Sequence, residues 1–243
     1  MKRAIIIGAS SGMGKEVSQL LLADGWQIGI GARRMDALQE LQTLSPQQVV
    51  TAAIDVMSDD APQRLEQLIA SNGGMDLFFL ASGIGKQNPN LDSEIELRTV
   101  ATNGMGFTRM VDTAFNWFAT HGGKGQIAVI SSIAGVKGLG MAPSYSATKA
   151  FQNTYIEALQ QLAHMRHLDI SFTDIRPGFV KTDLLNDGKN YPLLMNKDFV
   201  SRQIVKAIYR KKSVQIIDWR YRILVFFWHL IPRWLWVRLT IKN

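Results

Sequence analysis

A glycine-rich turn near the start of the chain, between a strand-like run and a helical pattern, constrains the fold more than any other feature. Residues 2–7 have the pattern of a short strand, and residues 8–14 read Gly-Ala-Ser-Ser-Gly-Met-Gly. A helical pattern follows and ends near Gly25. In this context glycines allow a sharp turn and a close approach of the backbone to a pyrophosphate, which the helix N-terminus binds. The turn therefore predicts a dinucleotide site made by Gly8, Ser10, Ser11, Gly12, Met13 and Gly14.

Two arginines follow the next strand-like segment, residues 27–31. Dinucleotide folds often place an acid at this point to bind the ribose 2′-hydroxyl, whereas an arginine accommodates a 2′-phosphate. Here the acid is missing, and Arg33 and Arg34 stand in its place. The pair favours NADP(H) over NAD(H) as cofactor. The alternative is that both side chains lie in solvent at the start of a helix.

Tyr145 and Lys149 open a long helical pattern and lie four residues apart. On a helix they share one face, where an ammonium favours the phenolate and lowers the pKa of the phenol. Ser132, at the end of an apolar strand-like run, can hydrogen-bond the same reacting oxygen. Alone the pair is a weak signal, because a half-buried tyrosine beside a solvated lysine arises often by chance.

With Ser132 upstream and the glycine turn before it, this pattern resembles the short-chain dehydrogenase/reductase family up to about residue 218. The resemblance implies a catalytic set of Asn103, Ser132, Tyr145 and Lys149. In that set Tyr145 exchanges the proton, Lys149 also binds the nicotinamide ribose, and Asn103 holds a water that links Lys149 to solvent. The implied activity is the interconversion of a carbonyl and an alcohol by hydride transfer from or to NADP(H). The family is usually dimeric or tetrameric, so a homodimer or homotetramer is expected.

The resemblance also implies further cofactor contacts. Asp55 and Val56 are expected at the adenine, although Asp55 can equally cap a turn, and residues 177–182 are expected over the nicotinamide. Leu80-Ala-Ser-Gly83 lacks the two asparagines usual in the family, and this departure puts the local hydrogen bonding in question. These further expected contacts are Asp55, Val56, Gly83, Pro177, Gly178, Val180 and Thr182.

Two shorter segments bear on the ligands. Residues 183–197 form an expected lid with apolar side chains, including Leu184 and Met195, which favours an apolar or bulky carbonyl substrate. His164 and His167 are expected on the surface, and no metal site is expected because no carboxylate accompanies them. Two alternatives to turnover stay open: an NADPH-binding sensor and a membrane-tethered scaffold.

Strand-like and helical segments alternate along residues 1–218. This alternation predicts an α/β fold, a single Rossmann-type domain whose doubly wound parallel sheet of about seven strands is flanked by helices. Residues 219–243 are expected as an amphipathic C-terminal extension. The chain has no cysteine, so disulfides are excluded, and a cytoplasmic location fits this composition.

The C-terminal segment differs in charge and aromatic content from the rest of the chain. Residues 202–243 carry ten lysines and arginines against one acid, Asp218, a net charge of +9, whereas residues 1–201 carry −2. Four of the six tryptophans lie between Trp219 and Arg238, but the longest apolar run is six residues, too short to span a bilayer. Tryptophan and arginine around an apolar helix fit either the surface of a membrane or a contact with a second subunit. Nucleic acid is a less fitting partner for such a segment.

Overall fold

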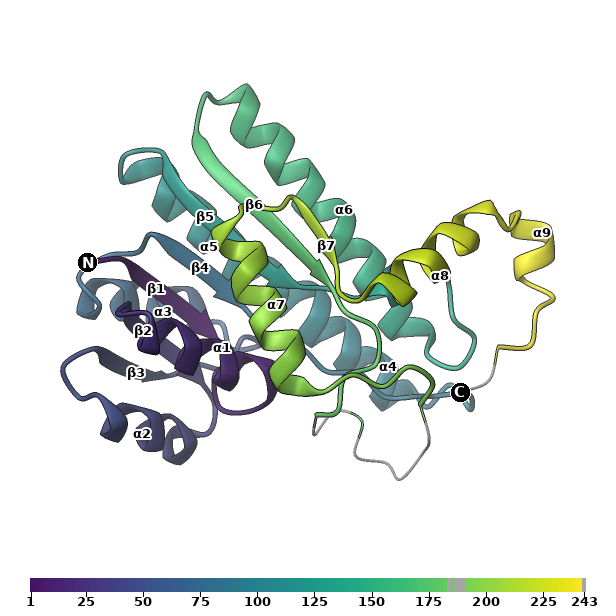
Figure 1. Cartoon of the computed structure of the whole chain (residues 1–243), viewed down its shortest axis with the longest axis horizontal. Helices are drawn as coiled ribbons and strands as arrows, with labels where there is room; N and C mark the ends of the chain where they lie inside the picture. The colour runs from purple at the N-terminus through teal and green to yellow at the C-terminus, as the bar shows by residue number, and fades with distance from the viewer. Residues whose placement is uncertain (183–184, 186–190, 242–243) are drawn as a thin grey trace.

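The computed structural model describes residues 1–182, 185 and 191–241. Its centre is a seven-stranded sheet in the order β3-β2-β1-β4-β5-β6-β7, and every pairing in it is parallel (Figure 1). The predicted α/β class and parallel sheet are therefore confirmed. The strands are β1 Arg3–Ile7, β2 Gln27–Ala32, β3 Val49–Ala53, β4 Leu77–Leu80, β5 Lys124–Ile130, β6 Asp169–Arg176 and β7 Val214–Ile216.

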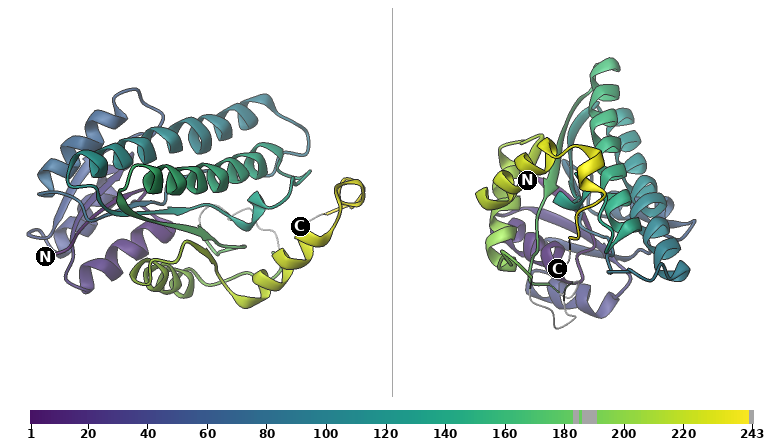
Figure 2. Two further views of the ribbon diagram at one scale, coloured as in Figure 1. Left: turned by 90° about the horizontal axis from the view of Figure 1, so that it is seen from above. Right: turned by 90° about the vertical axis from the view of Figure 1, so that its right-hand side faces the viewer.

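Helices cover both faces of the sheet (Figure 2). One face carries α1 Gly12–Ala23, α2 Met35–Leu44 and α7 Lys197–Tyr209. The other face carries α3 Ala61–Ser71, α4 Ser93–Val100, α5 Phe107–Thr120 and α6 Pro143–Met165. Neighbouring residues of β1 point to opposite faces, so Ile6 packs in the core with α1 and α7, while Ile5 packs in the core with α3 and α5. Both faces are buried, which explains why the strands are continuous apolar runs.

The sheet reverses its direction of winding beside β1. This strand pairs with β2 on one side and with β4 on the other, so the connections after β1 and after β3 run to opposite sides. In doubly wound sheets such a reversal leaves a crevice at the carboxyl ends of the strands. The glycine turn, which begins at Gly8 directly after β1, lies at that edge.

The long helical pattern expected over residues 93–119 is interrupted. A π-helical segment, Ala101–Gly106, separates α4 from α5 and contains Asn103. Such widened turns often occur at functional sites, because they redirect main-chain and side-chain groups out of the regular helical pattern.

The C-terminal extension consists of α8 Trp219–Leu230 and α9 Arg233–Trp236, which protrude at one end of the molecule (Figure 1). It is fixed to the body by buried side chains, since Tyr221, Val225 and Trp236 are all less than 8% exposed. Trp236 Nε1 donates to the carbonyl of Gly138 at 2.7 Å, and Lys137 Nζ donates to the carbonyl of Ile231 at 2.9 Å. No helix in the described part of the chain is long and apolar enough to cross a membrane.

Candidate active site

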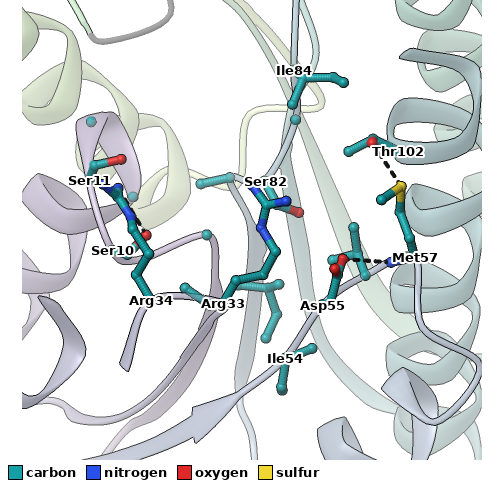
Figure 3. A pocket seen from close by; sticks show the side chains of 18 of the residues that line it. Ser10, Ser11, Arg33, Arg34, Ile54, Asp55, Met57, Ser82, Ile84 and Thr102 are labelled. Atoms are coloured by element: carbon teal, nitrogen blue, oxygen red, sulfur yellow. Dashed lines mark hydrogen bonds between the residues drawn. The ribbon is translucent and has the colours of Figure 1, made fainter. Parts of the chain in front are cut away.

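A pocket of about 370 Å³ lies at the carboxyl edge of β1, β2, β3 and β4 (Figure 3). It lies where the sheet reverses its winding, the position at which doubly wound folds bind ligands. Many of the residues expected at the cofactor line it together: Gly8, Ser10, Ser11, Gly12, Met13, Gly14, Arg33, Arg34, Asp55, Val56, Gly83 and Thr182.

The glycine turn is tightly packed. Gly8 has φ +92°, in the left-handed region, and a Cβ atom there would lie 2.5 Å from the main-chain nitrogen of Ser82. A Cβ atom at Gly14 would lie 2.2 Å from the carbonyl oxygen of Gly8, so only glycine lets α1 start this close to the turn. The glycine spacing therefore reflects two close backbone contacts, at Gly8 and at Gly14. The same turn also lines the pocket.

Three arginines border the pocket. Arg34 Nη2 donates to Ser10 Oγ at 3.3 Å, and the Arg33 side chain extends into the pocket (Figure 3). Arg98, from the last turn of α4, also lines it. Among the lining residues that the structure describes, Asp55 is the sole carboxylate. This excess of positive charge suits an anionic ligand.

Asp55 does cap a turn. Its Oδ1 accepts a hydrogen bond from Met57 N at 3.1 Å, and its carbonyl accepts one from Ser58 N at 2.9 Å. Val56 is buried beneath the pocket. Its side chain packs closely on Gly106, where an added Cβ atom would lie only 2.8 Å from it. Both residues line the pocket and also shape the chain after β3.

Tyr145 and Lys149 share one face of α6, which begins at Pro143, a residue well suited to a first helical turn. Residues 83–85 run between this pair and the pocket. A Cβ atom at Gly83 would lie 3.8 Å from Lys149 Nζ, and one at Gly85 would lie 2.7 Å from the Tyr145 ring. This glycine-rich segment therefore lies between the expected proton-transfer pair and the pocket.

Ser132 follows β5 and is nearly buried. Its hydroxyl accepts a hydrogen bond from Ala134 N at 3.1 Å, which starts a short 3₁₀ turn. It also interacts with the hydroxyl of Tyr145 and thereby acts to lower the pKa of that phenol. Ser132 and Tyr145 are thus placed to hydrogen-bond the same substrate oxygen atom.

A hydrogen-bonded bridge links Lys149 to Asn103. Lys149 Nζ donates to Gln152 Oε1 at 2.9 Å and to the carbonyl of Ile130 at 3.0 Å, and Gln152 Nε2 donates to the carbonyl of Asn103 at 2.8 Å. Gln152 and Asn103 are fully buried. The carboxamide of Gln152 therefore connects Lys149 directly to the main chain at Asn103. The expected link from Lys149 to solvent through a water molecule stays a prediction.

The side chain of Asn103 ties down the segment after β4. Its Nδ2 donates to the carbonyl of Ile84 at 2.7 Å, and its Oδ1 accepts from Ile84 N at 2.9 Å. These two bonds hold the chain directly after Leu80-Ala-Ser-Gly83, the element that lacks the asparagines usual in the family. One residue of the π-helical segment thus orders both Ile84 and, through its carbonyl, Gln152.

The electrostatics differ from the simple expectation for a tyrosine beside a lysine. Burial raises the pKa of Tyr145 above its ordinary value, and the hydrogen bond with Ser132 offsets this only in part. Lys149 Nζ lies 5.7 Å from the centre of the Tyr145 ring, and its own hydrogen bonds go to Ile130 and Gln152. The net shift of the phenol pKa is therefore upward, because burial outweighs the hydrogen bond with Ser132. The lowering expected from the charge of Lys149 stays a prediction.

The pKa of Lys149 is shifted as well. Burial lowers its pKa from 10.5 to about 8, although the negative charge of Asp174 opposes the change. Asp174 is 2% exposed, accepts a hydrogen bond from Ser131 Oγ, and pairs with Arg176 at 2.7 Å. The site thus holds a buried ammonium whose charge is lost within an accessible pH range.

The loop after β6 lies against the C-terminal extension. A Cβ atom at Gly178 would lie 2.1 Å from the Tyr221 ring, and the Tyr221 hydroxyl accepts from Phe179 N at 3.0 Å. Val180 is buried and pairs with Met195, which packs in the core. The lid expected over residues 183–197 stays a prediction. Thr182 faces the pocket, whereas Pro177, Gly178 and Val180 do not line it. Leu184 lies outside the described residues.

Known proteins agree with this arrangement. The family model described as short chain dehydrogenase matches residues 2–190. The chain belongs to the short-chain dehydrogenase family. An uncharacterized oxidoreductase of Myxococcus xanthus is 30% identical over 90% of this chain and 88% of its own length, and one of Mycobacterium tuberculosis is 27% identical over 97% and 93%. The protein is an oxidoreductase of this family.

Solved structures of the same fold are less similar in sequence. An alcohol dehydrogenase of Thermococcus sibiricus, complexed with 5-hydroxy-NADP, has a TM-score of 0.77 at 22% identity and covers 89% of this chain and 96% of its own. A short-chain dehydrogenase of Streptomyces avermitilis has a TM-score of 0.81 at 20% identity, over 94% of this chain and 92% of its own. At such identities these structures bear out the fold.

Three site residues escaped prediction from the sequence. Gln152 and Asp174 are polar residues within strongly patterned segments, and such a position is itself a signal of buried hydrogen bonding. Arg98 carries no local signal, because its approach to the pocket depends on how α4 packs in this short-chain dehydrogenase.

Proposed function

We propose that this chain is an NADP(H)-dependent oxidoreductase that interconverts a carbonyl and an alcohol, with Tyr145 as general acid and base. One observation carries the proposal: Tyr145 and Lys149 lie directly behind Gly83 and Gly85, whose segment lines the arginine-bordered pocket. A dinucleotide in that pocket and a carbonyl beside Tyr145 would then be neighbours.

The residues present suit the cofactor. The glycine turn leaves no room for Cβ atoms at Gly8 and Gly14 and brings its backbone to the pocket, beside the start of α1. Arg33 and Arg34 would hold a 2′-phosphate, which favours NADP(H). Two proteins of the same fold, the Thermococcus sibiricus alcohol dehydrogenase complexed with 5-hydroxy-NADP and an actinorhodin polyketide ketoreductase with NADPH, support the same cofactor. When bound, the nicotinamide supplies or accepts the hydride.

The chain's own residues perform the proton transfer. In the direction of reduction, Tyr145 donates its phenol proton to the carbonyl oxygen, and the Ser132 hydroxyl hydrogen-bonds that oxygen. The raised pKa of Tyr145 keeps the phenol protonated at neutral pH. The Lys149 ammonium stabilises the phenolate that forms, while Gln152 and Ile130 hold the ammonium in position.

Tyr145→Phe tests the proposal. Without the phenol proton, turnover should fall by about 10²–10⁴-fold, while NADPH binding, followed by the fluorescence of the nicotinamide, should persist. NADPH oxidation with aldehydes, ketones and quinones is the assay. Tyr155→Phe, on the same helix but packed against Phe107 and Phe151, is the matched control and should retain activity.

Two results would overturn this assignment. Turnover of Tyr145→Phe near that of wild type would remove Tyr145 as the proton donor. NADPH binding by wild type without oxidation by any compound of the panel would favour a sensor that binds the dinucleotide and does not turn it over.

A further inference from the structure

Helix α8 exposes a continuous apolar face. Trp219, Ile223, Phe226, Phe227 and Leu230 recur at helical spacing, and each is between 47% and 66% exposed. Side chains of this size are normally buried, and a contiguous exposed set of them marks an interaction site.

The exposed face is not simply the outer side of a helix that packs on the body. The opposite face of α8 already packs there through Tyr221 and Val225, with Leu224 and Trp228 half-buried beside them. The helix is therefore apolar on both sides, as expected for a helix covered on both sides. The exposed apolar character continues beyond Pro232 in Trp234, Leu235, Val237 and Leu239.

Charge distinguishes between possible partners. Residues 219–243 contain five lysines and arginines, namely Arg220, Arg222, Arg233, Arg238 and Lys242, and no aspartate or glutamate. A second copy would bring the same positive charge to the contact and be repelled, whereas an anionic surface would be attracted. Tryptophan and arginine at the border of an apolar face are also what an interfacial helix presents to lipid headgroups.

We propose that the exposed apolar side chains of residues 219–239, with Arg222, Arg233 and Arg238 around them, dock this protein on an anionic lipid bilayer. This surface is called the α8–α9 face below. Twelve residues make α8 about 18 Å long, less than the ~30 Å of the hydrocarbon layer. The helix therefore lies along the membrane surface, with Phe226 and Phe227 in the acyl region and the arginines at the phosphates.

Cosedimentation of the full chain with vesicles tests the proposal. The probes are vesicles of phosphatidylcholine alone and vesicles of phosphatidylcholine and phosphatidylglycerol in equal parts. Wild type should pellet with the anionic vesicles, and less with the neutral ones or at high salt. Phe226→Glu should weaken partitioning about tenfold or more, because an aromatic side chain that would enter the acyl region is replaced by a charge.

Matched variants separate this face from general effects. Leu44→Glu, at a 69% exposed residue at the end of α2, makes the same kind of change elsewhere and should partition as wild type does. Replacing Arg233 and Arg238 with glutamine should weaken binding to anionic vesicles about fivefold for each arginine. Replacing Lys211 and Lys212 with glutamine removes the same amount of charge outside the α8–α9 face. This double variant should lose less binding to anionic vesicles than the double arginine variant does.

The outcomes are distinct. Wild type that stays in the supernatant with both vesicles, or Phe226→Glu that pellets as wild type does, would overturn the proposal. If wild type does not bind vesicles and Phe226→Glu has a lower oligomeric mass than wild type in sedimentation velocity, the α8–α9 face is a contact between subunits. NADPH oxidation by Phe226→Glu without vesicles should be unchanged, so failure here is separable from failure of the proposed enzymatic activity.

Discussion

The candidate active site and the α8–α9 face invert the usual distribution of side chains in opposite ways. The site places polar groups where apolar ones are usual, since Lys149, Gln152 and Asn103 are at most 4% exposed. The α8–α9 face places aromatic groups where polar ones are usual, since Phe226 and Phe227 are 60% and 56% exposed. Neither arrangement is favoured by folding alone.

The two regions differ in how the unusual groups are satisfied. The polar groups of the site find partners within the chain, through the bridge from Lys149 over Gln152 to Asn103. The aromatic side chains of the α8–α9 face find none of comparable extent among the described residues and remain open to solvent. A site that is complete by itself is poised for a small ligand, whereas an incomplete surface indicates a large external partner.

Among changes in the affinity for NADPH, the largest is expected from the close packing of the glycine turn. Gly14→Ala places a methyl group 2.2 Å from the carbonyl oxygen of Gly8, so the backbone must move. Affinity for NADPH should fall by at least about tenfold, and the free energy of unfolding by about 1–3 kcal/mol. Gly138→Ala, where a Cβ atom meets nothing within 4 Å, is the control. Equal NADPH affinity and equal melting temperatures in both variants would show that the turn tolerates expansion.

Exposed arginines occur in both regions and should serve different anions. Replacing Arg33 and Arg34 with serine should raise the KM for NADPH by about tenfold or more and leave that for NADH nearly unchanged, because only NADPH carries the 2′-phosphate. Arg210→Ser, at an exposed arginine beyond the pocket, should alter neither constant. Parallel increases in both KM values would mean that the two arginines do not read the 2′-phosphate.

The bridge at Lys149 makes a prediction about pH. Because the pKa of Lys149 is lowered to about 8, kcat/KM for NADPH-dependent reduction should be constant below that pH and fall as pH rises through it. Gln152→Glu puts a carboxylate beside the Lys149 ammonium and favours its charged form. The falling part of the pH profile of kcat/KM, called the alkaline limb below, should therefore move to higher pH by about 1 unit or more.

Gln152→Leu provides the opposite test. It removes an acceptor from the ammonium, so the alkaline limb should move to lower pH, and the free energy of unfolding should fall by about 1–3 kcal/mol. A surface change such as Phe227→Glu should leave the alkaline limb in place. If the alkaline limb stays fixed in both Gln152 variants, Lys149 does not control it, and Gln152 has a purely structural role.

The smallest effect is expected where the two regions meet. Tyr221→Phe deletes the acceptor of Phe179 N and the donor to the carbonyls of Pro192 and Leu193 while keeping the ring against Gly178. Thermal unfolding should show a loss of about 1 kcal/mol, with little change in vesicle binding, because the exposed side chains are untouched. A large loss of vesicle binding would mean that the hydroxyl holds α8 in its orientation.

The fold was largely predictable because its signals are local. Apolar runs such as Ala4–Ile7 predict strands buried on both faces, and the glycine turn predicts the position of the pocket. The π-helical segment was not predictable, since the pattern of residues 93–119 is that of one helix, and the contacts of the buried Asn103 with Ile84 arise only in the folded chain. The upward direction of the Tyr145 pKa was missed for the same reason: burial is a tertiary property, whereas the four-residue spacing to Lys149 is local.

The bridge from Lys149 to Asn103 has a consequence for how the chain assembles. It joins the end of β5, the middle of α6 and the π-helical segment, and Asn103 in turn holds Ile84. The pocket lining, by contrast, comes almost entirely from residues 7–102, with Thr182 as the late addition. During synthesis the part of the chain that lines the pocket is therefore made first, whereas the part proposed to transfer the proton is complete only after α6 has been made and docked.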